Sequence, residues 1–163
     1  MLEALGTLFA PWADFYGGST LMSAGTTAVH LAGMFVGGGF AIAADRATLR
    51  ALRHPKALAH HLDELHAIHR PVLIGLGLTL LTGLMMLTAD WEALIDSSVF
   101  WVKMGVFVLL LANGWWLQHG SSRLRRARDR EQSAWRGRLG TSARVSAALW
   151  LATLVLGAVL PSL

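Results

Sequence analysis

The sequence predicts an all-α integral membrane protein: a four-helix bundle with an N-terminal amphipathic interfacial helix. Of its 163 residues, 54% are hydrophobic, and the mean hydropathy is +0.49, which is more apolar than an ordinary soluble domain. Four long apolar runs alternate with polar segments, and each approaches the ~20 residues that a hydrocarbon core of ~30 Å requires. We therefore expect a single membrane domain.

The N-terminal segment, 1–18, has apolar residues at every third or fourth position. This pattern is typical of an amphipathic helix that lies flat at the membrane surface. The segment has no basic region followed by a continuous apolar core, so it does not resemble a cleaved signal peptide. We expect the first span to direct insertion. The predicted spans are about 21–44, 71–89, 99–118 and 145–160.

The basic residues predict the orientation. Of the 14 Lys and Arg, all except Lys103 lie in the first or third loop, whereas the second loop carries only Asp90, Glu92 and Asp96. The positive-inside rule places the basic loops in the cytoplasm and both termini outside, as N-out/C-out in a bacterial cytoplasmic (inner) membrane. Anchoring beside apolar spans also explains the pI near 10.7 without any binding of nucleic acid.

Two ionisable side chains lie inside the predicted spans, His30 in the first and Lys103 in the third. Such residues are functional candidates because charge inside a bilayer is costly. His30 shares a helix face with Gly33 and Gly37, a row of small residues that lets another helix or a flat ligand approach closely. We expect His30 to face inward. The alternatives are that His30 only hydrogen-bonds a neighbouring helix and that Lys103 only reaches the headgroups.

Similar rows of small residues follow in the other spans. They comprise Gly75, Thr79 and Gly83, with Met86 after them, and Ser146, Trp150, Thr153 and Gly157. Three methionines near the level of Lys103 are either core filler or ligands of a His/Met haem or copper site; they are Met85, Met86 and Met104. Asn113 is expected to make an interhelical hydrogen bond.

A second candidate group lies at the cytoplasmic ends of the spans. His66 and His69 are three residues apart, and His119 ends the third span. Three histidines can ligate a metal or a haem, but histidines are also ordinary polar residues of an interface. The chain has no cysteine, which excludes disulfides, thiolate zinc sites and iron–sulfur clusters.

The arrangement of motifs resembles a known superfamily. It consists of a histidine in span one, Arg70-Pro71 opening a span that ends Thr82-Gly83-Leu84, and Phe100-Trp101-Val102-Lys103-Met104 opening span three. It resembles the four-helix bacterial protoporphyrinogen IX oxidases and the related copper-resistance-D-type membrane proteins, over most of the chain from His30 to about Gly120. The oxidases usually have a tryptophan after the histidine, where this chain has Leu31, and the N-terminal helix is an addition.

The resemblance implies roles for two residues. In the oxidases, a span-one histidine and a lysine near the start of span three are the essential pair, with bound haem proposed. These roles fall on His30 and Lys103, as axial ligand or proton acceptor and as partner of a propionate, with Gly33, Gly37 and Met86 around the cofactor. The first functional expectation is thus a small membrane redox protein that binds a b-type haem or porphyrin, with quinone as an electron partner.

Two other readings remain open. The first is a non-catalytic accessory subunit, without a cofactor, that packs in a larger respiratory or photosynthetic membrane complex or as a homo-oligomer. The small-residue rows and the tryptophans suit such packing. The second is a copper-handling membrane protein, in which histidine and methionine would hold the metal.

Overall fold

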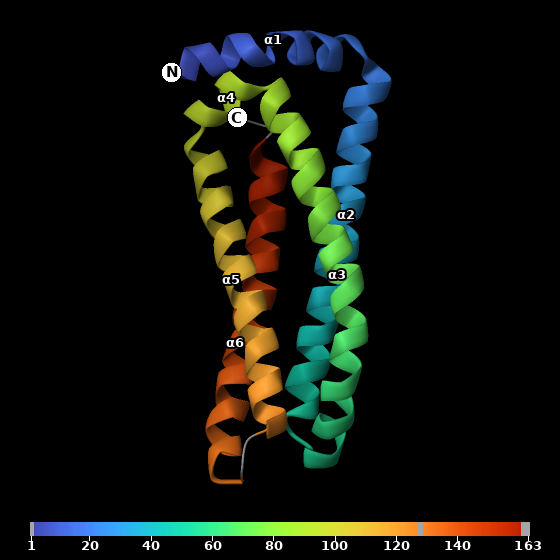
Figure 1. Cartoon of the computed structure of the whole chain (residues 1–163), viewed down its shortest axis with the longest axis vertical. Helices are drawn as coiled ribbons and strands as arrows, with labels where there is room; N and C mark the ends of the chain where they lie inside the picture. The colour runs from blue at the N-terminus through green and yellow to red at the C-terminus, as the bar shows by residue number, and fades with distance from the viewer. Residues whose placement is uncertain (1, 127–128, 161–163) are drawn as a thin grey trace.

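The computed structural model describes the backbone of residues 2–126 and 129–160, and the side chains of 5–54, 69–124 and 133–160. Within these ranges every regular element is a helix. The helices are α1 (Leu2–Gly18), α2 (Thr20–Ala51), α3 (Pro55–Ala89), α4 (Trp91–Asp96), α5 (Ser98–Arg126) and α6 (Asp129–Val159). Figure 1 shows α1 lying across one end of a bundle formed by α2, α3, α5 and α6. We call this end the α1 end and the opposite one the basic end.

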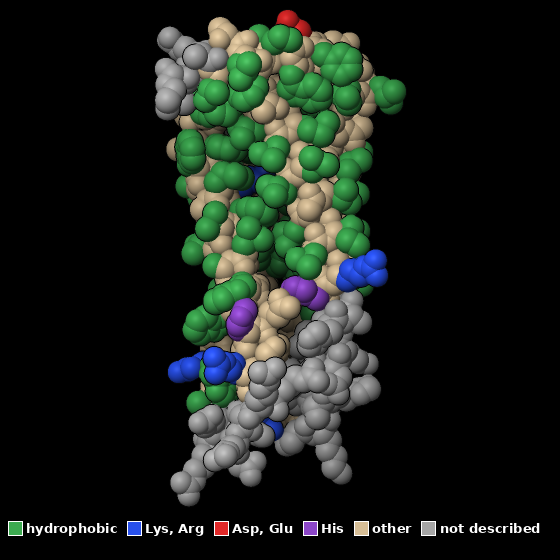
Figure 2. Space-filling view, viewed as in Figure 1, with side chains coloured by type: hydrophobic (Ala, Val, Ile, Leu, Met, Phe, Trp, Pro, Cys, Tyr) green, Lys and Arg blue, Asp and Glu red, His purple; other side chains and the backbone are tan. Residues whose placement is uncertain are grey.

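Four helical segments in the described part of the chain are long and apolar enough to cross a membrane. They are Thr20–Ala51, His69–Ala89, Ser98–Leu124 and Ser133–Val159. Large apolar side chains cover their outer faces; Phe35, for example, is 72% exposed and Val108 is 62% exposed. Figure 2 shows hydrophobic side chains over most of one face, with histidine and basic side chains toward the basic end. The prediction of an all-α, multi-pass membrane bundle is confirmed.

The helices extend beyond the predicted spans. α2 continues to Ala51, as the helical period past Ala44 predicts, and α6 begins at Asp129, well before the fourth predicted span. Helices of 29 to 35 residues, at a rise of ~1.5 Å per residue, are longer than a hydrocarbon core, so their ends leave it. In the polar third loop, Leu139 is only 2% exposed and packs with Ala51 and Leu124. Helical packing thus continues past the apolar runs.

Glycines bring α2 and α3 into backbone contact. A Cβ atom at Gly75 would overlap the backbone of Gly37, and one at Gly33 would lie 2.9 Å from the carbonyl oxygen of Gly75. On the other side of α2, a Cβ atom at Gly38 would lie 2.9 Å from the ring of Trp150 in α6. Of the two occupants expected beside Gly33 and Gly37, another helix or a flat ligand, the structure shows the helix.

The long helices pack in an open sequence rather than a closed ring. α2 packs on α3, α5 packs on α6, and α2 also packs on α6, whereas α3 and α5 barely touch. One lateral side of the bundle is therefore loosely closed.

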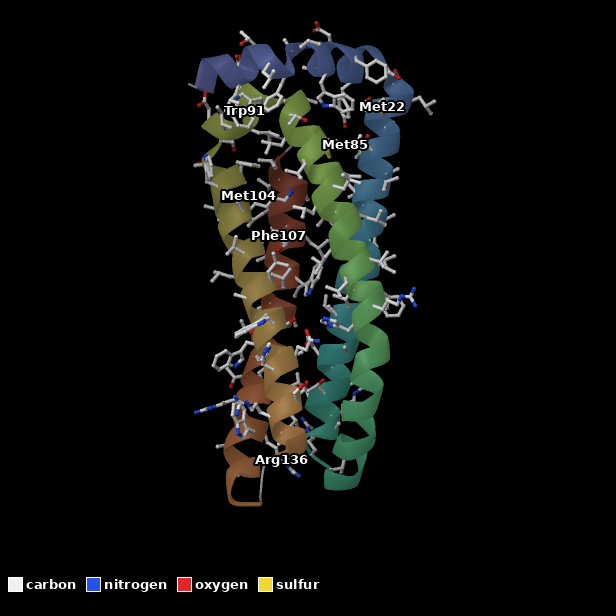
Figure 3. All side chains as sticks on the ribbon, viewed as in Figure 1. Met22, Met85, Trp91, Met104, Phe107 and Arg136 are labelled. Atoms are coloured by element: carbon white, nitrogen blue, oxygen red, sulfur yellow. The ribbon has the colours of Figure 1, made fainter. Side chains whose placement is uncertain are left out.

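Helix α1 is docked on the bundle through aromatic side chains. The Nε1–H group of Trp12 donates a hydrogen bond to the carbonyl of Met85, at 3.1 Å. Phe9 packs edge-on against Trp91, with ring centroids 5.3 Å apart, and the buried Tyr16 donates to the carbonyl of Ser23 at 3.4 Å. Met85 and Trp91 lie below α1 in Figure 3. These contacts hold α1 against α2, α3 and α4.

Candidate functional site

His30 faces the interior of the bundle, as its position beside Gly33 and Gly37 predicts. It lies on α2 in the half near the α1 end, and its ring packs against Gly83 of α3, where a Cβ atom would lie 3.4 Å from Cε1. Nδ1 of the ring lies 3.0 Å from Oγ1 of Thr82, a buried residue on α3. The glycine leaves room for the imidazole, and the threonine orients it.

The partners of this hydrogen bond determine the tautomer of His30. The hydroxyl of Thr82 donates its proton to the carbonyl of Leu78, at 2.6 Å, so its oxygen is left to accept a proton from His30. Nδ1 therefore carries the proton of the neutral ring, and Nε2 keeps its lone pair. Histidines that ligate metals are commonly oriented in this way.

Lys103 lies on α5 and its side chain crosses the bundle to α6. A Cβ atom at Gly157 would lie 3.6 Å from its Nζ atom and 3.8 Å from the methyl group of Met34. Met34 is one helical turn after His30 on α2, so Lys103 reaches the part of the bundle that His30 occupies. Among the side chains that the structure describes, no carboxylate forms an ion pair with Lys103. The two residues singled out in the sequence thus lie in one region of the α1 half of the bundle.

The methionines lie around this pair in different ways. Met34, which sequence reasoning missed, is 4% exposed and reaches the same glycine as Lys103. Its position four residues after His30 places it on the same face of α2 and was the available signal. Met86 is half-buried one turn beyond Thr82 on α3. Met85 and Met104 lie in the α1 half of the bundle (Figure 3).

The histidines expected at the basic end are placed differently. His69 is half-buried, His119 is exposed, and the side chain of His66 lies outside the described residues. The ring of His119 packs on Trp115, with centroids 4.1 Å apart, and its Nδ1 atom lies 3.0 Å from the carbonyl of that residue. Over the described side chains, no three His, Asp or Glu residues are grouped closely enough to hold a metal ion.

A buried carboxylate near the basic end was missed in the sequence. Asp45 is 2% exposed on α2. Ser146 of α6 lies beside its side chain, and its Oδ2 atom is buried without a partner. Its place at the end of an apolar run, before Arg46, made it look like the start of a loop. Because Gly33, Gly37, Ala41 and Asp45 follow at intervals of four residues, this row was the signal that placed it inward.

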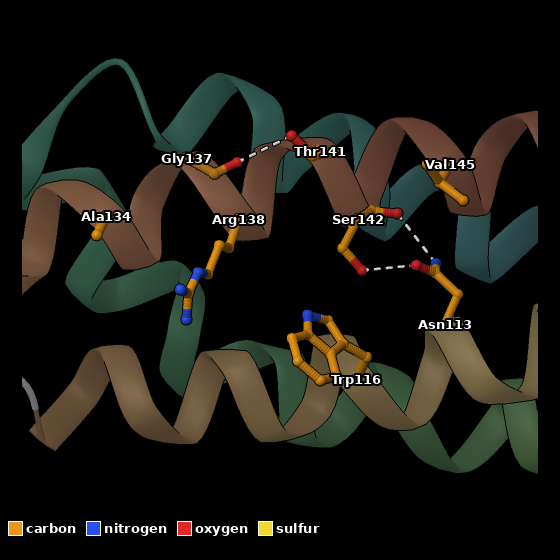
Figure 4. A pocket seen from close by; sticks show the side chains of 8 residues that line it. All are labelled: Asn113, Trp116, Ala134, Gly137, Arg138, Thr141, Ser142 and Val145. Atoms are coloured by element: carbon orange, nitrogen blue, oxygen red, sulfur yellow. Dashed lines mark hydrogen bonds between the residues drawn. The ribbon is translucent and has the colours of Figure 1, made fainter.

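An open hollow of about 450 Å³ lies between α5 and α6 toward the basic end. Figure 4 shows Asn113 and Ser142 at its edge. The Ser142 hydroxyl donates to Oδ1 of Asn113 at 2.8 Å, and the Asn113 amide donates to the Ser142 carbonyl at 3.0 Å. The interhelical hydrogen bond expected of Asn113 is confirmed. Arg138, at the rim, lies 4.9 Å from the ring centroid of Trp135.

No family model, curated protein or solved structure matches the chain. The resemblance based on His30 and Lys103 stays a prediction.

The His30–Lys103 pair has a definite chemical capacity. A neutral imidazole with an available lone pair can accept a proton or ligate a metal ion. An ammonium group in a medium of low dielectric attracts an anionic group strongly. Figure 2 shows a hollow in the apolar face between α3 and α5, with a basic side chain visible in its depth. A ligand with both an electrophilic centre and a carboxylate matches this pair.

Proposed function

We propose that His30 and Lys103 bind a tetrapyrrole, either a b-type haem or a porphyrin, in a small redox protein of the bacterial cytoplasmic membrane. The observation that carries the proposal is the hydrogen bond of 3.0 Å between His30 and Thr82. It holds the proton on Nδ1 and leaves Nε2 available for iron or for a proton from the ligand.

Lys103 supplies the second half of the site. An ammonium group inside a bundle is costly without a counter-charge, and the described side chains offer it no carboxylate partner. A propionate of the tetrapyrrole would meet this need. The glycine at position 157 leaves room for the amine.

The residues around His30 leave room for a tetrapyrrole on only one side of the histidine. The contact of Gly33 and Gly37 with α3 closes the space between α2 and α3. The ligand would therefore lie on the side of His30 that faces α5, where α3 and α5 barely touch. Met86 is half-buried on the neighbouring turn of α3. Haem, when bound, supplies one-electron chemistry; His30 orients it, Lys103 holds its carboxylate and the apolar helices exclude water.

The distribution of charges supports one orientation in the membrane. With the basic end in the cytoplasm and both termini outside, the His30–Lys103 pair lies in the outer half of the membrane. A quinone dissolved in the bilayer is the electron partner that we propose.

An absorption spectrum of the detergent-purified protein, expressed with a sufficient supply of haem, tests this function. We expect a Soret band and, after dithionite, sharp α-bands that are lost in His30→Ala. Lys103→Met should weaken haem retention, and Lys103→Arg should restore part of it because the positive charge returns. His119→Ala is the matched control, since this exposed histidine lies at the other end of the bundle.

A colourless preparation from haem-supplied cells would refute the proposal. If such a preparation purified together with larger subunits, the accessory-subunit reading would replace it. Copper in the same sample, lost on substitution of Met85 and Met86, would favour the copper-handling reading.

A further inference from the structure

A second cavity lies in the half of the bundle near the basic end, away from His30 and Lys103. It has a volume of about 270 Å³ and is bordered by α2, α3, α5 and α6. Its polar lining consists of Asp45, His69, Gln118 and Ser146. None of these residues belongs to the site described above.

One residue that borders the cavity, Asp45, carries an unmet hydrogen-bond acceptor. Asp45 is 2% exposed; Ser146 lies beside its carboxylate, while Oδ2 is buried and has no partner. A buried acceptor without a donor costs free energy, and a charged one costs more. An occupant of the cavity that donates a hydrogen bond to Asp45 would therefore be bound favourably.

The surroundings favour a neutral donor over a cation. Arginines crowd this end of the bundle, including Arg46 next to Asp45 and Arg70 next to His69. Their combined field repels a cationic ligand. A hydroxyl group donates a hydrogen bond without being repelled.

The opening of the cavity indicates how the rest of the ligand is built. Its rim includes Leu73 of α3 and Leu111 and Trp115 of α5, which are 54%, 45% and 59% exposed on the outer faces of those helices. Because α3 and α5 barely touch, the cavity opens sideways between them, toward lipid. An apolar chain attached to the ligand would leave through this opening.

The walls suit a flat ring. The buried Trp150 lines the cavity from α6 and Trp115 borders it from α5, and aromatic side chains stack on planar rings. Asp45 lies on α2 and Ser146 on α6, whereas His69 lies on α3 and Gln118 on α5. Polar groups thus border the cavity both on α2 and α6 and on α3 and α5. A ring with hydroxyl groups at opposite positions needs polar groups on two sides in this way.

We propose that this cavity binds the ring of a membrane-soluble hydroquinone, with one ring hydroxyl donating a hydrogen bond to the carboxylate of Asp45. The second hydroxyl meets His69 or Gln118, and the apolar tail passes between α3 and α5 into lipid. The inference rests on the proposed function in that it locates the quinone partner of that redox protein. The binding itself uses separate residues and does not require a tetrapyrrole.

The experiment uses the full chain in phosphatidylcholine nanodiscs and the quenching of tryptophan fluorescence. The probe is a decyl-substituted 1,4-benzoquinol, compared with its dimethyl ether, which has the same ring and tail but no hydroxyl protons. We expect saturable quenching by the quinol and affinity at least about tenfold lower for the ether, as the loss of a hydrogen bond to a charged group implies. This comparison needs no variant.

Variants then assign the site. Asp45→Asn should weaken quinol binding about tenfold, because the amide offers fewer acceptor positions for the hydroxyl. Asn113→Leu is the matched control: it removes hydrogen bonds between α5 and α6 at a similar depth but does not border this cavity, and it should bind quinol normally. His30→Ala should also bind normally, so failure of the tetrapyrrole proposal is distinguished from failure of this one.

Two results would overturn the inference. Equal affinity for the quinol and its dimethyl ether would show that the cavity is an ordinary lipid contact. Undiminished quinol binding by an Asp45→Asn protein that keeps the helical circular dichroism of the unaltered chain would place the ligand elsewhere.

Discussion

Thr82 of α3 holds the imidazole of His30 in α2 through a single hydrogen bond of 3.0 Å to Nδ1. The threonine is 5% exposed and its own proton is engaged by the carbonyl of Leu78. Residues of α3, far from His30 in sequence, thus determine which nitrogen of this intramembrane histidine carries no proton.

This relationship predicts the tautomer of His30. ¹⁵N NMR of histidine-labelled protein, with the signal assigned through His30→Gln, should show a protonated Nδ1 and an unprotonated Nε2. Thr82→Val removes the acceptor and should reduce this preference, whereas Thr82→Ser should keep it. Thr88→Val is the control, because that hydroxyl bonds only to its own helix, at 2.9 Å from the carbonyl of Leu84. A protonated Nε2 in the unaltered protein would contradict the structure.

The contact between Gly75 and Gly37 predicts a strong effect of one methyl group. Gly75→Ala would force α2 and α3 apart, since its Cβ would overlap the backbone of α2. We expect the free energy of unfolding in detergent to fall by about 1–3 kcal/mol, the usual cost of overpacking. Gly77→Ala is two residues away and has open space, so it should be neutral or slightly stabilising. Equal stability of the two variants would contradict this seam.

The paired hydrogen bonds of Asn113 and Ser142 predict an energetic coupling between α5 and α6. Asn113→Ala and Ser142→Ala should each destabilise the protein, and the double variant should cost less than the two together. The expected coupling is about 0.6–2 kcal/mol, as for interhelical hydrogen bonds in membranes. A double-mutant cycle from denaturation in detergent measures it. Strictly additive effects would mean that the two residues act independently.

The charges predict the orientation of the chain, and the natural absence of cysteine makes this simple to measure. D96C, in the exposed turn of α4, should react with a membrane-impermeant maleimide in intact spheroplasts. R123C, at the exposed basic end of α5, should react only after permeabilisation. The unaltered chain serves as the blank. The reverse pattern would invert the proposed topology.

The sequence predicted what depends on helical period. His30, Gly33 and Gly37 lie on one face at intervals that repeat with the turn of a helix, so their inward direction followed without a structure. The partner of His30 did not follow, because the register between two helices depends on how their surfaces fit, and no spacing within one chain segment records it. The motif Thr82-Gly83-Leu84 alone does not indicate that its threonine contacts His30.

Asp45 and the polar third loop show a different limit. Hydropathy marks where a helix enters water, not where it stops packing. Asp45 therefore looked like the edge of a loop, although its side chain is buried between helices and borders a cavity. Leu139 lies among arginines in a polar segment but is buried against α2 and α5. For both residues, small or apolar residues three or four positions away along the helix indicate that the side chain faces inward.

The open order of the long helices has a consequence for biogenesis. α2 with α3, and α5 with α6, are each neighbours in sequence and form the two most extensive contacts of the bundle. The first hairpin can therefore close on its glycines while the second is still being synthesised. The packing of α2 on α6, which includes the contact of Trp150 with Gly38, then joins the two halves. Separately expressed hairpins that reassociate through this packing would give a split protein.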